Sequence, residues 1–230
     1  MRSPRSLVVG ICALAAIPLG LLGGGALAQS LSEGEASSVQ VSTYETGDVQ
    51  WRGSVAAGKP WRGALFRGVQ LPAEGTDFFT WDFPWRTAPN RTWRRWATDR
   101  TIIVILRVLA EYRTAHPEAG RIGIADLSRP HGGDFGKRFG GLGHASHQNG
   151  IDADILYPRL DLQELAPRKP SQINRPLARD LVNRFVGAGA QYVFVGHRTG
   201  LSGPRKIVQR LAHHDDHMHV RFFARGRARD

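Results

Sequence analysis

The chain has 230 residues, of which 41% are hydrophobic and 22% are charged, a balance that is typical of a folded globular protein and excludes wholesale disorder. A formal net charge of +11 indicates an anionic partner, for which nucleic acid is one candidate among several. The single cysteine excludes an intrachain disulfide, a cysteine-based zinc finger and a cysteine-held iron–sulfur cluster.

The N-terminus has the three parts of a secretory signal peptide. Two arginines precede an apolar run at residues 7–22, and the Ala-Leu-Ala at 26–28 is typical of a cleavage site. A membrane anchor is the alternative, because the stretch to Leu27 could nearly span a bilayer, but its glycines and its small-residue end favour cleavage. We therefore expect residues 1–28 to be a signal peptide and the protein to be exported, to the periplasm or to the cell wall and extracellular space. Cleavage removes Cys12, lowers the formal charge to +9 and leaves no segment that would insert stably into a membrane.

The first part of the exported chain predicts little regular structure. Residues 29–48 are rich in Ser, Glu and Gly and predict a flexible lead-in, so that one domain occupies residues 49–230. Residues 49–96 carry all six tryptophans and frequent Gly and Pro, which predict loops. Thr98 then caps a predicted helix that continues to about Ala115, where a His-Pro pair ends it.

The rest of the chain predicts strands and helices around a glycine-rich loop at 129–143. Alternation with a period of two indicates strands, and one-sided apolar stripes indicate helices. The predicted strands are residues 121–127, 151–157, 191–196 and 217–223, and the predicted helices are residues 175–188 and 204–212. Because there is no internal repeat, this order predicts one domain of the α+β class, with a small central antiparallel sheet flanked by helices and long loops.

All nine histidines lie in the second half of the chain, and six of them fall in two clusters, at residues 143–154 and 213–221. In the first cluster the loop residue His147 precedes Asp154, a residue of a predicted strand, by seven positions. In the second cluster His217 and His219 lie on one face of a predicted strand, because side chains alternate along a strand, while Met218 points to the core.

The two clusters together predict a metal site. If the strands at 151–157 and 217–223 are neighbours, Asp154 can meet His219 while His147 reaches in from its loop. Two imidazoles and one carboxylate, with a fourth position open to water, are typical of a catalytic Zn²⁺ site. A lone His-x-His arises often by chance, but both clusters in one exported chain favour the metal interpretation. Three nearby carboxylates are expected to support the site or to cap loops: Asp152, Asp215 and Asp216.

Four segments resemble those of the penicillin-insensitive murein endopeptidases. These are zinc peptidases of the wider group that contains lysostaphin, the D-Ala-D-Ala metallopeptidases and the hedgehog signalling domain. The four segments are Ala-Asp-Leu-Ser-Arg-Pro at 125–130, Gly-Gly at 132–133, and the two histidine segments at 143–154 and 214–221. The resemblance extends from about Gly53 to Phe222, and it is most specific in the histidine segments.

This resemblance implies roles for six residues in a single zinc-centred domain. The implied zinc ligands are His147, Asp154 and His219. His217 corresponds to the catalytic base or transition-state stabiliser, and His214 and His144 correspond to further active-site residues. Some descriptions of the family treat the position of His144 as an additional metal ligand. Two features depart from the family: the exported chain lacks the disulfides of described members, and no histidine between His147 and His197 is available for a second metal site.

The implied reaction is zinc-assisted hydrolysis of an amide in the peptide cross-links of peptidoglycan. Zinc is the implied cofactor and peptidoglycan the implied partner, and nucleic acid is not expected to bind. The open alternatives are a zinc D,D- or L,D-carboxypeptidase acting on wall peptides and a non-catalytic zinc-containing wall-binding domain. The basic charge taken alone would also suit a nuclease.

Arginines and tryptophans interleave at residues 85–100. Because arginine pairs with carboxylates and stacks on aromatic rings, this pattern predicts a surface that binds the anionic wall polymer. The alternative is that the tryptophans belong to the core and the arginines to a solvated face. The residues in question are Arg86, Arg91, Arg94, Arg95 and Arg100, with Trp85, Trp93 and Trp96.

Overall fold

The computed structural model describes residues 49–224. The predicted signal peptide at 1–28 and the predicted lead-in at 29–48 lie outside the described residues. Within the described range, no helix combines the length and the apolar character that crossing a membrane requires.

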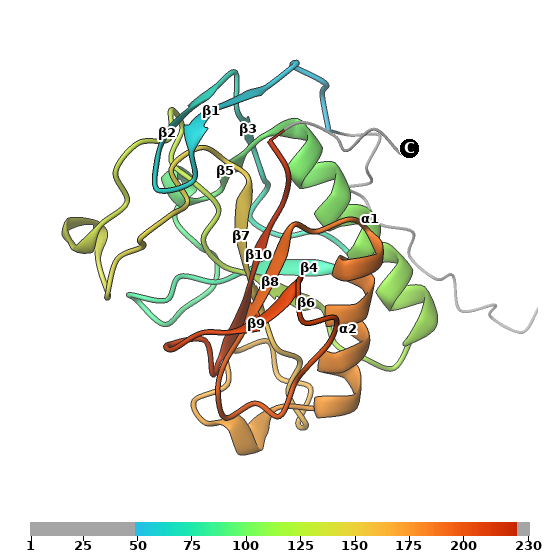
Figure 1. The fold of residues 1–230 in the computed structure, drawn as a ribbon. Coiled ribbons are helices and arrows are strands. Elements are labelled where there is room, and N and C mark those ends of the chain that lie inside the picture. The colour runs from blue at the N-terminus through green and yellow to red at the C-terminus, as the bar shows by residue number, and fades with distance from the viewer. Residues whose placement is uncertain (1–48, 225–230) are drawn as a thin grey trace, which may run out of the picture. The chain divides into compact units, whose positions relative to one another are not determined.

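Six strands form the central sheet, in the order β4-β6-β7-β10-β8-β9 (Figure 1). Their bounds are β4 Phe78–Thr80, β6 Ile122–Ile124, β7 Asp152–Leu156, β10 His217–Arg221, β8 Tyr192–Val195 and β9 Val208–Arg210. The three inner pairs, β6–β7, β7–β10 and β10–β8, are antiparallel as predicted, whereas the two outer pairs, β4–β6 and β8–β9, are parallel. The sheet is therefore mixed, and its antiparallel part is the centre.

Strands β7 and β10 are direct neighbours, which is the pairing that the metal interpretation requires. In their register His219 lies opposite Asp154, and Met218 lies opposite Ile155. Because side chains alternate along a strand, the two pairs leave opposite faces of the sheet. Met218 and Ile155 are fully buried in the hydrophobic core, as is Val220. The histidine and the aspartate therefore share the other face.

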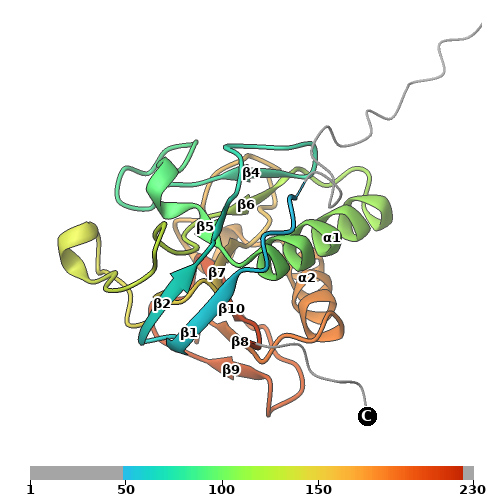
Figure 2. The ribbon, with the colours of Figure 1, turned by 90° about the horizontal axis from the view of Figure 1, so that it is seen from above.

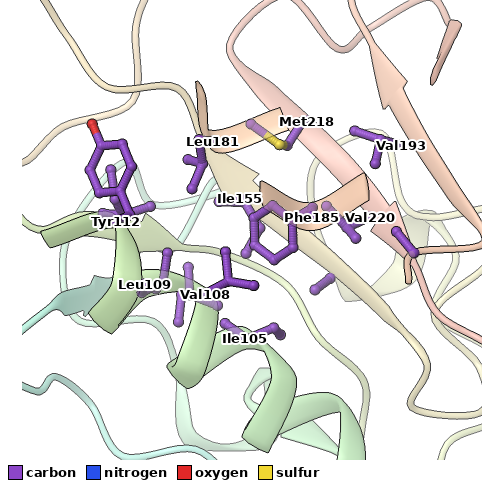
Figure 3. Close-up of a cluster of buried hydrophobic side chains, with 14 of the residues drawn as sticks. Ile105, Val108, Leu109, Tyr112, Ile155, Leu181, Phe185, Val193, Met218 and Val220 are labelled. Carbon is purple, nitrogen blue, oxygen red and sulfur yellow. The ribbon is translucent and has the colours of Figure 1, made fainter. Parts of the chain in front are cut away.

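The two α-helices, α1 Asp99–Ala115 and α2 Arg175–Gly187, pack on the core face of this sheet. Figure 3 shows Leu109 of α1 and Phe185 of α2 in one cluster with Val220 of β10. The side chain of Thr98 caps α1 as predicted, because its oxygen accepts a hydrogen bond from the backbone N–H of Thr101. Because both helices lie on the core face, neither of them covers the histidine face.

Residues 49–96 contain short strands, so the prediction of loops alone is wrong for this segment. The strands are β1 Val55–Lys59, β2 Arg62–Phe66, β3 Val69–Gln70, β4 and β5 Trp96–Ala97. Strands β1 and β2 form a hairpin, and β3 pairs with β5. The hairpin strands are largely exposed or half-buried, so they lack the apolar alternation that would reveal them in the sequence. Figure 2 shows this hairpin on the side of the sheet away from α1 and α2.

The predicted helix at 204–212 is also wrong. The backbone N–H groups of Ile207 and Val208 both donate to the carbonyl of Pro204, which makes a tight turn. The chain then continues as β9, which pairs in parallel with β8 and places Val208 in the core. Pairing with β8, a contact that the local pattern does not contain, decides the conformation of this segment.

Candidate metal centre

Three of the residues singled out in the sequence converge on the histidine face of the sheet. His147 Nε2 lies 3.1 Å from His219 Nδ1 and 3.3 Å from Asp154 Oδ1, and the last two atoms are 3.2 Å apart. Atoms that bind one tetrahedral ion at about 2.0–2.1 Å lie about 3.3 Å from each other. The triangle therefore has the spacing of three ligands around a single metal ion.

Asp154 is the residue of this triangle that most needs a cation. It is 1% exposed, and neither of its carboxylate oxygens has a hydrogen-bond partner in the described structure. Burial raises the pKa of its carboxyl group, but the rings of His147 and His217 outweigh burial and hold the pKa well below its usual value. A buried ionised carboxylate requires compensation by a donor or a cation. The donor set of two imidazoles and a carboxylate fits a zinc ion.

The ring of His147 is oriented by the segment that follows β6. Its Nδ1 donates to the carbonyl of Leu127 at 2.5 Å, which leaves the lone pair of Nε2 facing Asp154. The backbone of His147 has a φ of +66°, which few non-glycine residues adopt. Two hydrogen bonds hold this conformation: Ser128 Oγ donates to the carbonyl of His147, and the N–H of His147 donates to Asp152 Oδ2.

Asp152 also orients His219. Its Oδ1 lies 3.0 Å from Nε2 of His219, so that nitrogen donates to Asp152 and the ring turns Nδ1 toward the triangle. Burial lowers the pKa of His219, but Asp152 and Asp154 outweigh it and raise the pKa to about 9. Arg221 donates to the same oxygen of Asp152 at 2.6 Å. Asp152 thus binds both histidine segments, as expected of a carboxylate that supports the site.

His144 lies at the edge of the triangle. Its Nδ1 is 3.7 Å from Asp154 Oδ2, and its ring centroid is 4.3 Å from that of His147. His144, His147 and Asp154 each offer one ligand atom, and these atoms all lie within 4.8 Å of one another, so this group could hold a metal ion. The other nitrogen of His144, Nε2, lies 2.7 Å from Oδ2 of Asp126. The sequence placed Asp126 in a recognisable segment but assigned it no role.

His217 is the first residue of β10, and His214 precedes this strand by three residues. Nε2 of His217 is 3.7 Å from Asp154 Oδ1, while its Nδ1 is 2.7 Å from Oδ1 of Asp216. Burial lowers the pKa of His217, but Asp154 and Asp216 outweigh burial, and the net pKa is raised. The ring of His214 lies 4.8 Å from that of His217, and burial lowers its pKa to about 4. The surroundings of His217 thus favour its charged form, and those of His214 favour its neutral form.

A cleft of about 1090 Å³ opens over these residues. Apolar side chains of Trp61, Phe83 and Phe194 line it, together with the glycine-rich segment 140–146. Two of its lining arginines are neutralised by buried carboxylates, Arg94 by Asp126 and Arg221 by Asp152. Lys137 is the lining cation for which the described residues provide no ion pair.

Comparison with protein-family models matches residues 56–186 to the penicillin-insensitive murein endopeptidases. The match spans more than half of the chain. The chain belongs to this family of zinc peptidases. No curated protein matches the chain.

The murein endopeptidase match covers one half of the site. His144, His147 and Asp154 lie within the matched residues, whereas His217 and His219 follow them in the chain. The antiparallel pairing of β7 with β10 brings the second half of the site to the first. The structure therefore places His217 and His219, which lie beyond the matched residues, beside the matched half of the site.

The predicted arginine–tryptophan surface of this murein endopeptidase is wrong for two of its arginines. Arg94 and Arg95 are 1% and 6% exposed, so neither can meet a wall polymer. Arg94 binds Asp126, and the guanidinium of Arg95 donates to the carbonyl of Leu71. Asp126 and Leu71 lie 32 and 24 positions from their arginines, so the local sequence pattern does not reveal that the two arginines are buried. Trp85 is 65% exposed under the guanidinium of Arg91, so the alternative of tryptophans as core is wrong at this position.

Proposed function

We propose that the protein is a zinc-dependent endopeptidase that hydrolyses the peptide cross-links of peptidoglycan. The observation that carries this proposal is the triangle of His147, Asp154 and His219, whose ligand atoms lie 3.1–3.3 Å apart beside a large cleft. Membership of the murein endopeptidase family supports the class of substrate. A wall substrate is consistent with export by the predicted signal peptide.

His147, Asp154 and His219 would hold the zinc ion. A bound zinc ion supplies a Lewis acid for the scissile carbonyl and lowers the pKa of water at the site. His144 lies close enough to Asp154 to add a further nitrogen or to contact substrate. The chain's own contribution is to orient the rings of His147 and His219, since each is hydrogen-bonded through its other nitrogen.

His217 is suited to stabilise negative charge as it develops on the scissile carbonyl oxygen. Its Nδ1 is bonded to Asp216, and its Nε2 points toward the triangle. A donor held in this way is positioned before the reaction, which is the general requirement for stabilising an oxyanion. His214 donates through Nδ1 to the carbonyl of Ala212, so its Nε2 is available to accept a proton and return it to the leaving amine.

The cleft is consistent with a branched peptide substrate. Its volume of about 1090 Å³ exceeds the range of roughly 300–1,000 Å³ typical of small-molecule pockets. Trp61, 57% exposed at the turn of the β1–β2 hairpin, and Leu142, 67% exposed in the glycine-rich loop, offer apolar contacts. The excess of basic residues favours association with a polymer that carries carboxylates.

Digestion of purified sacculi tests this function. We expect the zinc-loaded protein to convert cross-linked muropeptide dimers to monomers, to stop when a chelator is added and to resume with added zinc, as measured by mass spectrometry of the products. Release of free D-Ala without loss of dimers would indicate the carboxypeptidase alternative. Binding to sacculi without any product would indicate the wall-binding alternative. His131→Ala, a change at an exposed histidine outside the cleft lining, is the matched control.

A further inference from the structure

One three-residue segment after β6 orients both loop histidines of the site. Asp126 Oδ2 lies 2.7 Å from Nε2 of His144, and the carbonyl of Leu127 accepts from Nδ1 of His147 at 2.5 Å. The hydroxyl of Ser128 donates to the carbonyl of His147 at 2.6 Å. Leu127 and Ser128 thereby fix a proposed ligand, whereas Asp126 is a buried carboxylate that the proposed mechanism does not use.

Asp126 is itself held rigidly by a buried arginine. Arg94 donates from Nε to Oδ1 at 2.6 Å and from Nη2 to Oδ2 at 2.5 Å, and both side chains are 1% exposed. Asn90 Nδ2 adds a third hydrogen bond to Oδ1 at 3.1 Å. The remaining nitrogen of Arg94, Nη1, donates to the carbonyl of Phe139, just before the glycine-rich segment 140–146, at 2.7 Å. The carboxylate therefore has no freedom to turn away from His144.

We propose that Asp126, locked by Arg94, is a positioning residue that keeps the proton of His144 on Nε2 and aims Nδ1 at Asp154. An ionised carboxylate only accepts hydrogen bonds, so the imidazole nitrogen that faces it must carry a proton. The two-point ion pair with the buried guanidinium of Arg94 keeps this carboxylate ionised. The inference rests on the proposed function for the use of His144, while the orientation itself is a property of the folded chain.

Asp126→Asn removes the constraint with little change of shape, because an amide can donate as well as accept. The matched control is Asp82→Asn. Asp82 is also fully buried and bound twice by an arginine, Arg91, at 2.6 and 3.2 Å, but it contacts no histidine among the described residues. Both variants weaken an ion pair between a buried aspartate and an arginine, although Arg91 is 21% exposed and Arg94 only 1%. A change at His144 in Asp126→Asn alone therefore reports on the bond to that ring.

The first measurement is the ¹⁵N spectrum of the histidine rings in the metal-free protein at pH 8. We expect His144 to carry its proton on Nε2 in the unmodified chain, to lose this preference in Asp126→Asn and to keep it in Asp82→Asn. A wild-type ring that carries its only proton on Nδ1 overturns the proposal even if Asp126→Asn fails to fold. An unchanged His144 spectrum in a folded Asp126→Asn variant overturns it as well.

The second measurement is a double-mutant cycle on zinc affinity and on kcat/KM for cross-linked muropeptides. Asp126→Asn and His144→Ala are each expected to cost about 10- to 100-fold, the usual effect of losing a residue that orients a metal ligand. If Asp126 acts through His144, the double variant is no worse than His144→Ala alone. Losses that multiply contradict the proposal. A protein that shows the expected spectrum but cleaves no peptidoglycan contradicts the proposed function and leaves the positioning role supported.

Discussion

Asp154 and His219 face each other directly across the antiparallel pair β7–β10, with Oδ1 and Nδ1 3.2 Å apart. Strand pairing alone brings them together, since they lie 65 positions apart in the sequence. The carboxylate has no hydrogen-bond partner in the described structure, and the imidazole is turned toward it by Asp152. The pair forms the rigid part of the proposed zinc site, and His147 completes it from a loop.

The removal of His219 tests the ligand triangle. His219→Ala leaves one imidazole and one carboxylate at the centre, and we expect zinc affinity to fall by at least about 100-fold, beyond the range seen for residues that only orient ligands. Metal content after dialysis against a weak chelator, measured by elemental mass spectrometry, checks this. Retention of one equivalent of zinc by the variant would show that His219 is not a ligand. His131→Ala, at an exposed histidine, is expected to retain the metal.

His217 is expected to matter for turnover and not for metal binding. His217→Ala removes the donor that Asp216 holds beside the triangle but leaves His147, Asp154 and His219 in place. We expect full zinc content and a kcat lowered by about 10²- to 10³-fold, the usual effect of losing one donor to an oxyanion. Steady-state kinetics on a purified muropeptide dimer, with metal analysis of the same sample, measure both. Normal hydrolysis by this variant would exclude the assigned role.

Arg94 is expected to be essential for stability. Arg94→Ala leaves the buried carboxylate of Asp126 without its ion pair, and breaking a buried pair in this way costs about 3–5 kcal/mol of unfolding free energy. Urea unfolding followed by tryptophan fluorescence measures the change. Arg100→Ala, at an exposed arginine of the same stretch, is expected to change stability by less than about 0.5 kcal/mol. Similar small effects for both variants would contradict the buried pair.

Asp180 provides a pH-dependent contribution to stability that is separate from the site. Burial raises its pKa, but bonds to Arg184 at 2.6 Å and to His116 at 3.0 Å outweigh burial and lower it below the usual value. A lowered folded-state pKa means that the stabilisation is present above the unfolded pKa of about 3.9 and is lost as pH falls through the folded value.

We therefore expect Asp180→Asn to be destabilised at pH 6 by less than about 1 kcal/mol, because the side chain is 34% exposed. The difference from the unmodified chain should shrink as the pH is lowered below 4. Urea unfolding at a series of pH values measures it. A difference that stays constant or grows with acid would contradict the lowered pKa.

The sequence alone determined the elements whose patterns are local. The apolar stripe and Thr98 cap of α1, the limits of α2 and the alternation of β10 are each contained within a few turns or a single strand, and the structure confirms them. Short-range spacing also grouped the histidines and pointed to a metal. Weakly patterned segments were beyond its reach: the exposed hairpin β1–β2 and the edge strand β9 take their conformation from partners elsewhere in the chain.

Only the tertiary structure decided which distant groups meet. The register of β7 against β10 sets His219 opposite Asp154, and a shift by one residue would turn the histidine into the core. Burial of Arg94 depends on Asp126, 32 positions away, so an arginine that the pattern placed on the surface belongs to the support of His144. Local sequence encodes periodicity, whereas the free energy of a buried charge depends on the partner that folding brings to it.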